Sequence, residues 1–297
     1  MARNGTYYVG RVLKLGLLDQ SMLIDGILRP TSIKVRGNKW TIIDSQEYKQ
    51  GGDHFIYGRL SKYSPDAEVT IIDEVNRQQI QQSEPNLLVA SSPFVYIPDH
   101  SGIAFLNVYS HIEQKTFIDR FNKIIEETHN GFFVDCDIEL ISDLKSFAAK
   151  LGALDRIYQI NSKISPPNPL FGPLWSSLKD YLIERNTDRM TIIENAPETQ
   201  SIETDLPNIV QLAADQESDQ EYFTEEEIPI GDAAILMAAD GYGSGTVRGM
   251  QNEEVVTIKT SETAKNFSFT KIPDPYELYE KVLSIFEKIK NNRHMQH

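Results

Sequence analysis

The feature that most constrains the fold is a switch in apolar periodicity within residues 91–165. Segments with a period of two residues, typical of strands, alternate with segments whose period of about 3.6 residues is typical of helices. The clearest helical segment places on one face Phe117, Phe121, Ile124 and Ile125. The expected order is therefore β-β-α-β-α-β, and a sheet with helices on one face buries both kinds of apolar surface.

The flanking segments predict an α+β fold, with a mainly antiparallel N-terminal β-sheet region and a C-terminal hairpin followed by a long helix. In the first region we expect turns at Gly37-Asn38 and Ser64-Pro65-Asp66, and a polar connector at residues 77–86. The periodicity of apolar residues and the distribution of charge predict four parts of the chain. They are a β-rich, net-positive region 1–82, an α+β domain 83–195, an acidic linker 196–230 and a helix-hairpin-helix region 231–297.

The composition is that of a soluble globular protein, with 297 residues, 40% of them hydrophobic and 24% charged. No apolar run approaches the roughly 20 residues that cross a bilayer. The opening stretch MARNGTYYVGRV lacks the apolar core of a secretory signal. The single cysteine, Cys136, can form no internal disulfide, which fits a reducing compartment. We therefore expect a cytoplasmic protein without a membrane partner.

Charge is distributed unevenly along a chain whose net charge is −14. Residues 1–82 hold 11 Lys and Arg against 9 Asp and Glu, and within residues 1–63 the balance is 10 against 5. Residues 83–297 hold 18 against 34, and residues 190–247 contain 13 acidic residues and no Lys or Arg. Because nucleic-acid binding depends on neutralising phosphates, the N-terminal region is the expected place for a polyanion contact. The acidic remainder favours a protein partner or self-association.

Two similar basic phrases lie in the N-terminal region, YVGRVLKL at residues 8–15 and IYGRLSKY at residues 56–63. One interpretation is two neighbouring strands of a sheet, whose glycines allow close packing. The other is a nucleic-acid contact, in which arginines bind phosphates and bases stack on aromatic rings. The nucleic-acid-binding candidates are then Arg11, Lys14, Arg36, Lys39, Arg59 and Lys62.

Three carboxylates alternate along the predicted strand FFVDCDIELI, namely Asp135, Asp137 and Glu139. They share one face, and such a cluster suits Mg²⁺ or Mn²⁺ in phosphoryl chemistry. The opposite face is uniformly apolar, which is also the pattern of any half-buried strand with a solvated outer face. His100 and Ser101 adjoin in a turn, but a catalytic pair needs spatial contact and an orienting acid.

The phrases GRVLKL and IYGRLSKY, the segment SKISPPNP and the segment AADGYGSGTVRGMQNEEV occur in this order along the chain. Together they resemble an uncharacterised bacterial family of unknown function met in phage-defence and abortive-infection contexts. The layout is also distantly similar to the sensor protein of the lambdoid Rex exclusion system. The resemblance implies a cytosolic defence-associated protein without settled catalytic residues, and a Rex-like sensor implies DNA binding and dimer formation. The acidity of residues 190–247 departs from what a DNA-binding protein shows.

These patterns lead to three hypotheses. The first is a non-enzymatic antiphage component, without a cofactor, that senses nucleic acid or assembles with an effector. The second is a metal-dependent nuclease or nucleotide-processing enzyme that uses Asp135, Asp137 and Glu139 with Mg²⁺ or Mn²⁺. The third is an acidic protein-interaction module, or a DNA mimic, that uses residues 190–247.

Overall fold

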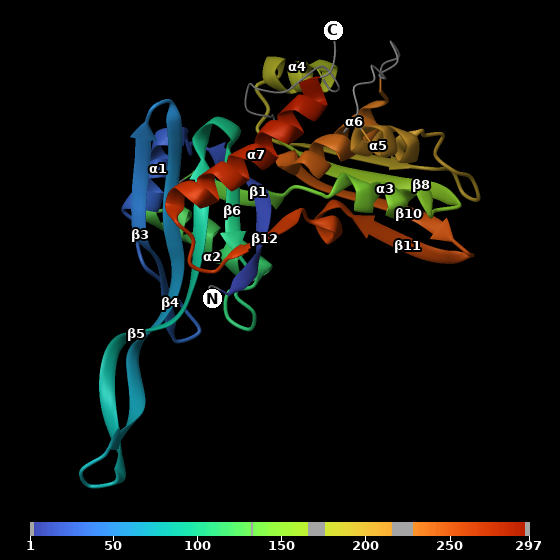
Figure 1. Ribbon diagram of the computed structural model, residues 1–297. Coiled ribbons are helices and arrows are strands. Elements are labelled where there is room, and N and C mark those ends of the chain that lie inside the picture. The colour runs from blue at the N-terminus through green and yellow to red at the C-terminus, as the bar shows by residue number, and fades with distance from the viewer. Residues whose placement is uncertain (1–2, 132, 166–175, 216–227, 295–297) are drawn as a thin grey trace.

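The computed structural model describes residues 3–131, 133–165, 176–215 and 228–294. It is an α+β structure with two antiparallel sheets that lie side by side (Figure 1). The predicted fold class is therefore confirmed. Within the described residues, no helix combines the length and the apolar character that a membrane span requires.

The first sheet has eight strands, and β1 lies next to one edge, where it pairs with three other strands. The strand order is β12 (Asn266–Thr270), β1 (Asn4–Gly16), β6 (Gly102–Leu106), β5 (Gln78–Ile97), β4 (Asp53–Asp73), β3 (Asn38–Gln50) and β2 (Ile33–Val35), and β7 (Val134–Leu140) pairs with the second half of β1. One face packs against α1 (Gln20–Leu28) and α2 (Gln114–Thr128). The other face packs against the C-terminal helix α7 (Pro275–His294).

The second sheet has four strands, in the order β11 (Glu254–Lys259), β10 (Gly243–Gln251), β8 (Arg156–Ile164) and β9 (Met190–Asn195). Its apolar face packs against four helices, which are α3 (Leu144–Gly152), α4 (Ser176–Glu184), α5 (Leu206–Asp215) and α6 (Ile230–Met237). Helix α6 is apolar almost all round and is buried from Gly231 to Met237, as its sequence indicates. The opposite face carries no described helix.

The short helical segment η3 (Ala238–Tyr242) connects α6 to β10 at the junction of the two sheets. It is buried throughout, and Gly241 adopts a left-handed conformation with φ of 84°. A side chain at this position would be strained and would also lie 3.2 Å from the carbonyl oxygen of Glu139 on β7. The glycine therefore allows η3 to approach the first sheet closely.

The alternating order of elements between residues 91 and 165 is confirmed, but its strands do not form one layer. Strands β5, β6 and β7 belong to the first sheet, whereas β8 belongs to the second. The C-terminal region divides in the same way, because β10 and β11 join the second sheet while β12 returns to β1. The expected boundary between residues 82 and 83 falls inside β5. Residues 216–227, the most acidic part of the expected linker, lie outside the described residues.

The expected turn at Ser64-Pro65-Asp66 and the expected connector at residues 77–86 are wrong. The chain instead continues as a long hairpin of β4 and β5, which turns only at residues 74–77 and projects from the first sheet (Figure 1). Pro65 lies two residues beyond the register shift between Lys62 and Tyr63, and close to Asn86 with its positive φ of 57°. Beyond Tyr63, β3 no longer pairs with β4, so the missing N–H of Pro65 costs no ladder bond on that edge.

Aspartate side chains cap the starts of α1, α3 and α7. Helix α1 was not expected, although Asp19 caps it by accepting a hydrogen bond from the Met22 backbone N–H at 2.8 Å. At α3 the cap is Asp143, and the hydroxyl of Ser142 donates to the carbonyl of Thr260 at 2.8 Å. Helix α7 is capped by Asp274, which accepts a hydrogen bond from the Tyr276 backbone N–H at 2.9 Å.

The glycines of the two basic phrases serve close packing. A Cβ on Gly10 would lie 2.7 Å from the carbonyl oxygen of Glu139, and a Cβ on Gly58 would lie 2.9 Å from the ring of Phe94. The two strands belong to the same sheet, but β6 and β5 separate them. The interpretation as neighbouring strands is thus corrected to two strands of one sheet that do not touch.

We predict that Gly10→Ala destabilises the protein by about 1–3 kcal/mol, because the added methyl group meets main-chain atoms that cannot move aside. The measurement is the free energy of unfolding from urea denaturation. Gly152→Ala is the matched control, since a Cβ there meets no atom within 4 Å and alanine favours the helix. Equal stability of Gly10→Ala and the wild type would contradict the packing role.

Candidate functional site

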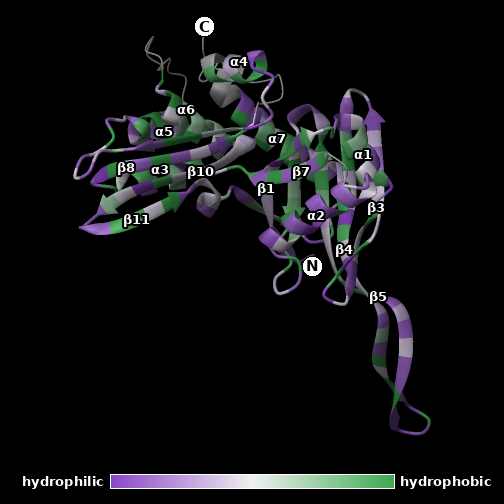
Figure 2. Ribbon diagram, turned by 180° about the vertical axis from the view of Figure 1, so that it is seen from behind, coloured by the Kyte–Doolittle hydropathy of each residue, from purple (hydrophilic) through white to green (hydrophobic). Residues whose placement is uncertain are grey.

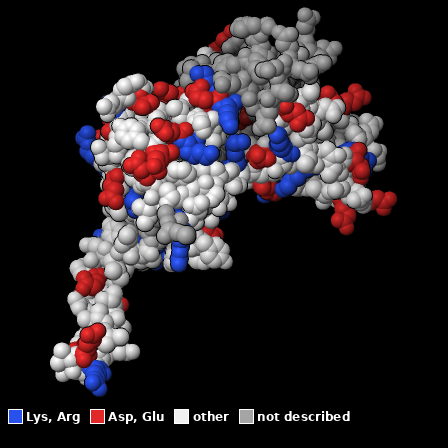
Figure 3. Space-filling view, viewed as in Figure 1, with Lys and Arg blue, Asp and Glu red and all other residues white. Residues whose placement is uncertain are grey.

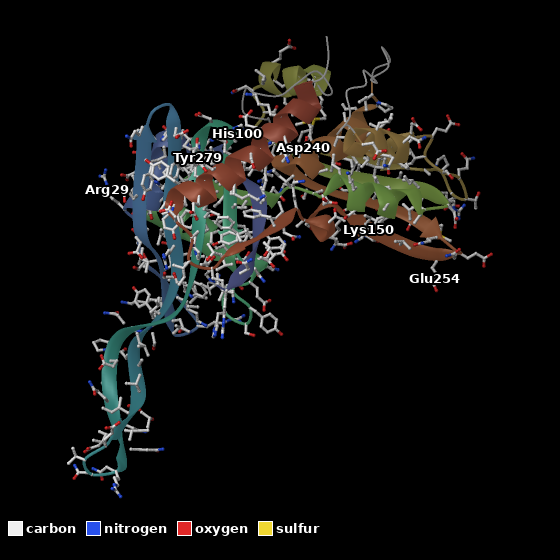
Figure 4. All side chains as sticks on the ribbon, viewed as in Figure 1. Arg29, His100, Lys150, Asp240, Glu254 and Tyr279 are labelled. Carbon is white, nitrogen blue, oxygen red and sulfur yellow. The ribbon has the colours of Figure 1, made fainter. Side chains whose placement is uncertain are left out.

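Arg11 is fully buried where the two sheets meet, although it is the first candidate for nucleic-acid binding. Its Nε donates to the carbonyl of Asp240 at 2.8 Å, and its Nη1 donates to the carbonyl of His100 at 2.6 Å. The guanidinium carbon lies 4.6 Å from the ring centroid of Tyr242 and 5.2 Å from that of Phe286. Figure 4 shows His100 and Asp240 at this junction. A guanidinium enclosed in this way connects β1 to η3, to the turn at His100 and to α7, and it cannot reach a phosphate in solvent.

The other phrase places its arginine differently. The side chain of Arg59 is 28% exposed, and its Nε lies 3.7 Å from the carboxylate of Asp44. Arg11 and Arg59 do lie on the same face of the sheet, since Val9 and Tyr57 from their strands both contribute to the apolar cluster under α7. The covered part of this face contains Arg11, and Arg59 lies at its partly open margin.

Lys14 points to the opposite face of β1 from Arg11 and is half-buried. Its Nζ donates to Oε1 of Gln20 and to Oγ of Ser101, both at 3.0 Å. Burial lowers the pKa of Lys14. Tyr96 also donates to Oε1 of Gln20, at 3.1 Å, so this lysine belongs to an internal polar cluster.

The remaining candidates are also dispersed. Lys62 lies opposite Trp40 in the β3–β4 register, and its Nζ is 5.7 Å from the Trp40 ring centroid. Lys39 precedes Trp40 by one residue and therefore points to the other face of the sheet. Arg36 occupies the β2–β3 turn with a positive φ of 49°. That turn spans Arg36-Gly37, one residue before the expected position. The six predicted cations thus do not form a single binding surface.

Ser101 and His100 do not form a catalytic pair. The imidazole Nε2 of His100 lies 3.2 Å from Oε1 of Glu287, and the ring stacks on Phe286. The hydroxyl of Ser101 instead accepts a hydrogen bond from Lys14 on the other side of the sheet. A Ser–Lys pair can act as a nucleophile and base, but Ser101 is only 5% exposed, so a substrate cannot reach it in this structure.

The three carboxylates of β7 alternate with buried apolar residues, as predicted. They lie opposite β1 in the register, with Asp137 facing Leu13 and Glu139 facing Arg11. One oxygen of Asp137 accepts a hydrogen bond from Asn122 at 3.2 Å, and the other lies 3.8 Å from Nη2 of Arg189. A cationic group thus sits where a metal ion would be expected.

Burial raises the pKa of two carboxyl groups on this strand, those of Asp137 and Glu139. The pKa of Glu139 is raised to about 7: burial is the largest cause, the charge of Asp137 acts in the same direction, and the charges of Arg189 and Lys163 oppose the shift. Among the residues that the structure describes, no three His, Cys, Asp or Glu side chains gather as a metal site requires. The geometry therefore gives no support to a metal-dependent nuclease at β7.

A different cationic surface lies on the helix-free face of the second sheet. Val247, Ile160 and Ile258 point from this sheet into the helix-covered core, so residues one position away point to the opposite face. All four cations on that opposite face are exposed, and they are Arg156, Lys163, Arg248 and Lys259. We call this surface the open face.

The open face contains no Asp or Glu within the four described strands. Thr257 and Gln159 flank Arg248 in the register, and Gln159 donates to Oδ1 of Asn195 at 2.6 Å. The register shifts beside Arg248, which leaves Tyr158 as an additional residue opposite the same arginine. Hydrophilic residues recur along these strands in Figure 2. The surface is thus cationic and rich in amide and hydroxyl groups.

The cations of the open face are not used in ion pairs within the described part of the chain. Arg156 donates to the carbonyl of Thr199 at 3.3 Å. Lys163, nearest the junction, lies close enough to Glu139 to lower the pKa of that carboxyl. Arg156, Arg248 and Lys259 are therefore the cations whose charge is least compensated by neighbouring groups.

A family model described as a domain of unknown function (DUF4747) matches residues 23–219, about two thirds of the chain. The match begins inside α1 and includes the projecting hairpin, β8 and β9. It includes neither β1 of the first sheet nor β10 and β11 of the second. A comparison with curated proteins finds no significant match.

We predict that Arg11→Met destabilises the protein by about 3 kcal/mol or more, because it leaves buried carbonyl groups without their donor. Thermal or urea unfolding measures the change. Arg59→Met removes the same charge from a partly exposed site and should cost about 1 kcal/mol or less. Similar losses for the two variants would show that burial of Arg11 contributes no special stability.

We predict that Glu139→Gln stabilises the protein at pH 8 relative to pH 5. The pKa of Glu139 is raised to about 7 in the folded state, so its favourable contribution is present below the unfolded value near 4.5 and is lost as pH rises through 7. Glutamine removes this loss, and the gain at pH 8 should reach up to about 3 kcal/mol.

The measurement is urea unfolding of wild type and variant at both pH values. Glu254→Gln is the control, because this carboxylate is exposed at the tip of the β10–β11 hairpin (Figure 4). A stability difference for Glu139→Gln that is the same at both pH values would contradict the raised pKa.

Proposed function

We propose that this chain, which belongs to the DUF4747 family, binds single-stranded nucleic acid on the open face of its second sheet. The observation that carries the proposal is the charge of that face. Four exposed cations gather there without a carboxylate, in a chain whose net charge is −14. A uniformly acidic protein repels phosphates, so a cationic surface of this kind is what a phosphate backbone would select.

The shape of the open face favours a single strand. It is a four-stranded sheet with helices behind it, an arrangement on which extended nucleic acid can lie with its bases exposed to the protein. Gln159, Asn161 and Asn195 offer amide groups to base edges or sugars, and Tyr158 offers a ring for stacking.

The spacing of the cations suits a chain that runs along the strands. Arg156 and Lys163 lie seven residues apart on β8, which corresponds to roughly 23 Å on an extended strand. Arg248 lies between them on the neighbouring strand β10, and Lys259 lies one strand further out. A nucleic acid backbone following this path meets successive cations over a length of several nucleotides.

This proposal moves the nucleic-acid contact from the N-terminal sheet to the second sheet. The role that fits it best is a non-catalytic, cytoplasmic component that senses nucleic acid. The resemblance of the sequence to phage-defence families supports a place for such a sensor in antiphage defence. The burial of Arg11 and Lys14, and the dispersal of the other N-terminal cations, argue against the first location.

We predict that Arg248→Gln with Lys259→Gln weakens binding of a fluorescent single-stranded oligonucleotide by roughly tenfold at physiological salt, because two phosphate contacts are lost. Fluorescence anisotropy over a salt series measures it. The slope of log K against log salt should become shallower by about 1.4, the value for two contacts on a single strand.

The control is Arg29→Gln with Lys49→Gln, which removes the same charge from exposed ion pairs on the first sheet. This variant should bind with nearly wild-type affinity and slope. Wild-type protein that does not bind the oligonucleotide at low salt, or equal losses in the two variants, would overturn the proposed function.

A further inference from the structure

The hairpin of β4 and β5 continues well beyond the body of the protein. We define its projecting part, residues 64–89, as the arm. Strand β3 pairs with β4 only as far as Tyr63, and β6 pairs with β5 only from Phe94 onward. Both edges of the arm therefore carry backbone groups without a strand partner, and the arm reaches away from both sheets (Figures 1 and 2).

The arm exposes apolar side chains along its length. Ile71 lies opposite Ile80 in the register, and these side chains are 42% and 37% exposed. Val69 and Ala67 share their face, which we call the apolar face of the arm. Nearer the body, Leu87, Leu88 and Val89 are also exposed. An isolated two-stranded ribbon is only marginally stable in water, so an arm of this composition is suited to packing against another surface.

The arm is strongly acidic. It carries five carboxylates, Asp66, Glu68, Asp73, Glu74 and Glu84, and its only cation is Arg77 at the tip. Figure 3 shows the red carboxylates along the arm and the blue group at its end. The net charge of the arm is thus −4. With this charge and its apolar face, the arm fits a surface that is both cationic and partly apolar.

The open face of the second sheet meets both requirements. It carries four cations and no carboxylate, and Ile193 and Val255 expose apolar side chains there, 55% and 67% of each. In Figures 1 and 2 the arm projects from the side of the first sheet that is far from the second sheet, so the arm of one molecule does not lie on its own open face. A second copy of the chain supplies the matching surface.

We propose that the arm of one molecule docks on the open face of a second copy of this chain. The apolar face of the arm packs on Ile193 and Val255, and the arm carboxylates lie near Arg248 and Lys259. Each copy has one arm and one open face, so two copies make both contacts at once in a closed dimer.

The dimensions of the two surfaces agree. The paired arm from Asp66 to Asp73 is about 26 Å long, and β8 of the open face is about 30 Å long. Packing a ribbon on a sheet follows the geometry of other sheet-on-sheet contacts. A closed dimer contains two such contacts and therefore buries twice the area of a single contact.

This inference uses the same surface as the proposed function but does not depend on it. Self-association through the arm is an interaction between proteins, and it persists after nuclease treatment. If the open face also binds nucleic acid, the arm and the nucleic acid compete for it, and added oligonucleotide shifts the dimer toward monomer.

Charge reversal on each surface tests the contact. The arm variant is Glu74→Lys with Glu84→Lys, and the sheet variant is Arg248→Glu with Lys259→Glu. We expect the nuclease-treated wild type to dimerise in sedimentation velocity, and each variant alone to dissociate at least about a hundredfold more readily because like charges meet. An equimolar mixture of the two variants should form a heterodimer, since both of its contacts again pair opposite charges.

Two further variants control for the arm's fold and total charge. Asp66→Lys with Glu68→Lys makes the same change of net charge on the other face of the arm and should leave most of the dimer intact. Ile71→Thr with Ile80→Thr keeps β-branched residues but removes apolar surface, and should weaken the dimer. A wild type that stays monomeric throughout a concentration series, or a mixture that fails to form the heterodimer, overturns the proposal. Oligonucleotide binding is measured separately by fluorescence anisotropy. A failure of the proposed dimer therefore leaves the proposed nucleic-acid binding to be tested by that measurement, and the reverse also holds.

Discussion

The buried guanidinium of Arg11 fixes how the two sheets meet. A charge removed from water must be fully engaged, and here carbonyls of η1 (Pro98–His100) and η3 and the rings of Tyr242 and Phe286 surround it. These groups come from the first sheet, the connector to the second sheet and the C-terminal helix. Because a guanidinium presents donors in a rigid plane, it sets their relative orientation as well as their proximity. The positions of the open face and of the arm both follow from this junction.

A second electrostatic match supports the same junction. The acidic strand β7 meets Lys163 of the second sheet and Arg189 of the segment before β9. This pairing accounts for Asp137 and Glu139, two of the three carboxylates that resembled a metal site in the sequence. It also uses some of the positive charge near the junction, so the uncompensated cations of the second sheet lie farther out. The acidic and basic parts of this chain are therefore arranged in space in a way that the order of residues does not reveal.

Local periodicity predicted most elements, because each depends on neighbours within a few residues. The stripe of Phe117, Phe121 and Ile124 predicted α2, and all three are fully buried. Periodicity carries no information on strand partners, so it did not reveal that β8 leaves the first sheet or that β12 returns to β1. The open face was missed for this reason, since Arg156 and Lys259 lie about a hundred residues apart and only the register brings them together. The burial of Arg11 has no local signal either, because its partners come from distant segments.

A cationic face on a protein poses a problem of selectivity, because any polyanion in the cell can bind to it. A resident acidic segment raises the affinity that a ligand needs, since binding must first displace that segment. In the proposed dimer the arm has this role: it presents carboxylates at a high effective concentration while the second contact holds the copies together. Weak or short anions then fail to open the dimer, whereas a nucleic acid long enough to engage several cations succeeds. The acidity of the arm is then the means by which nucleic-acid binding on the open face is made selective.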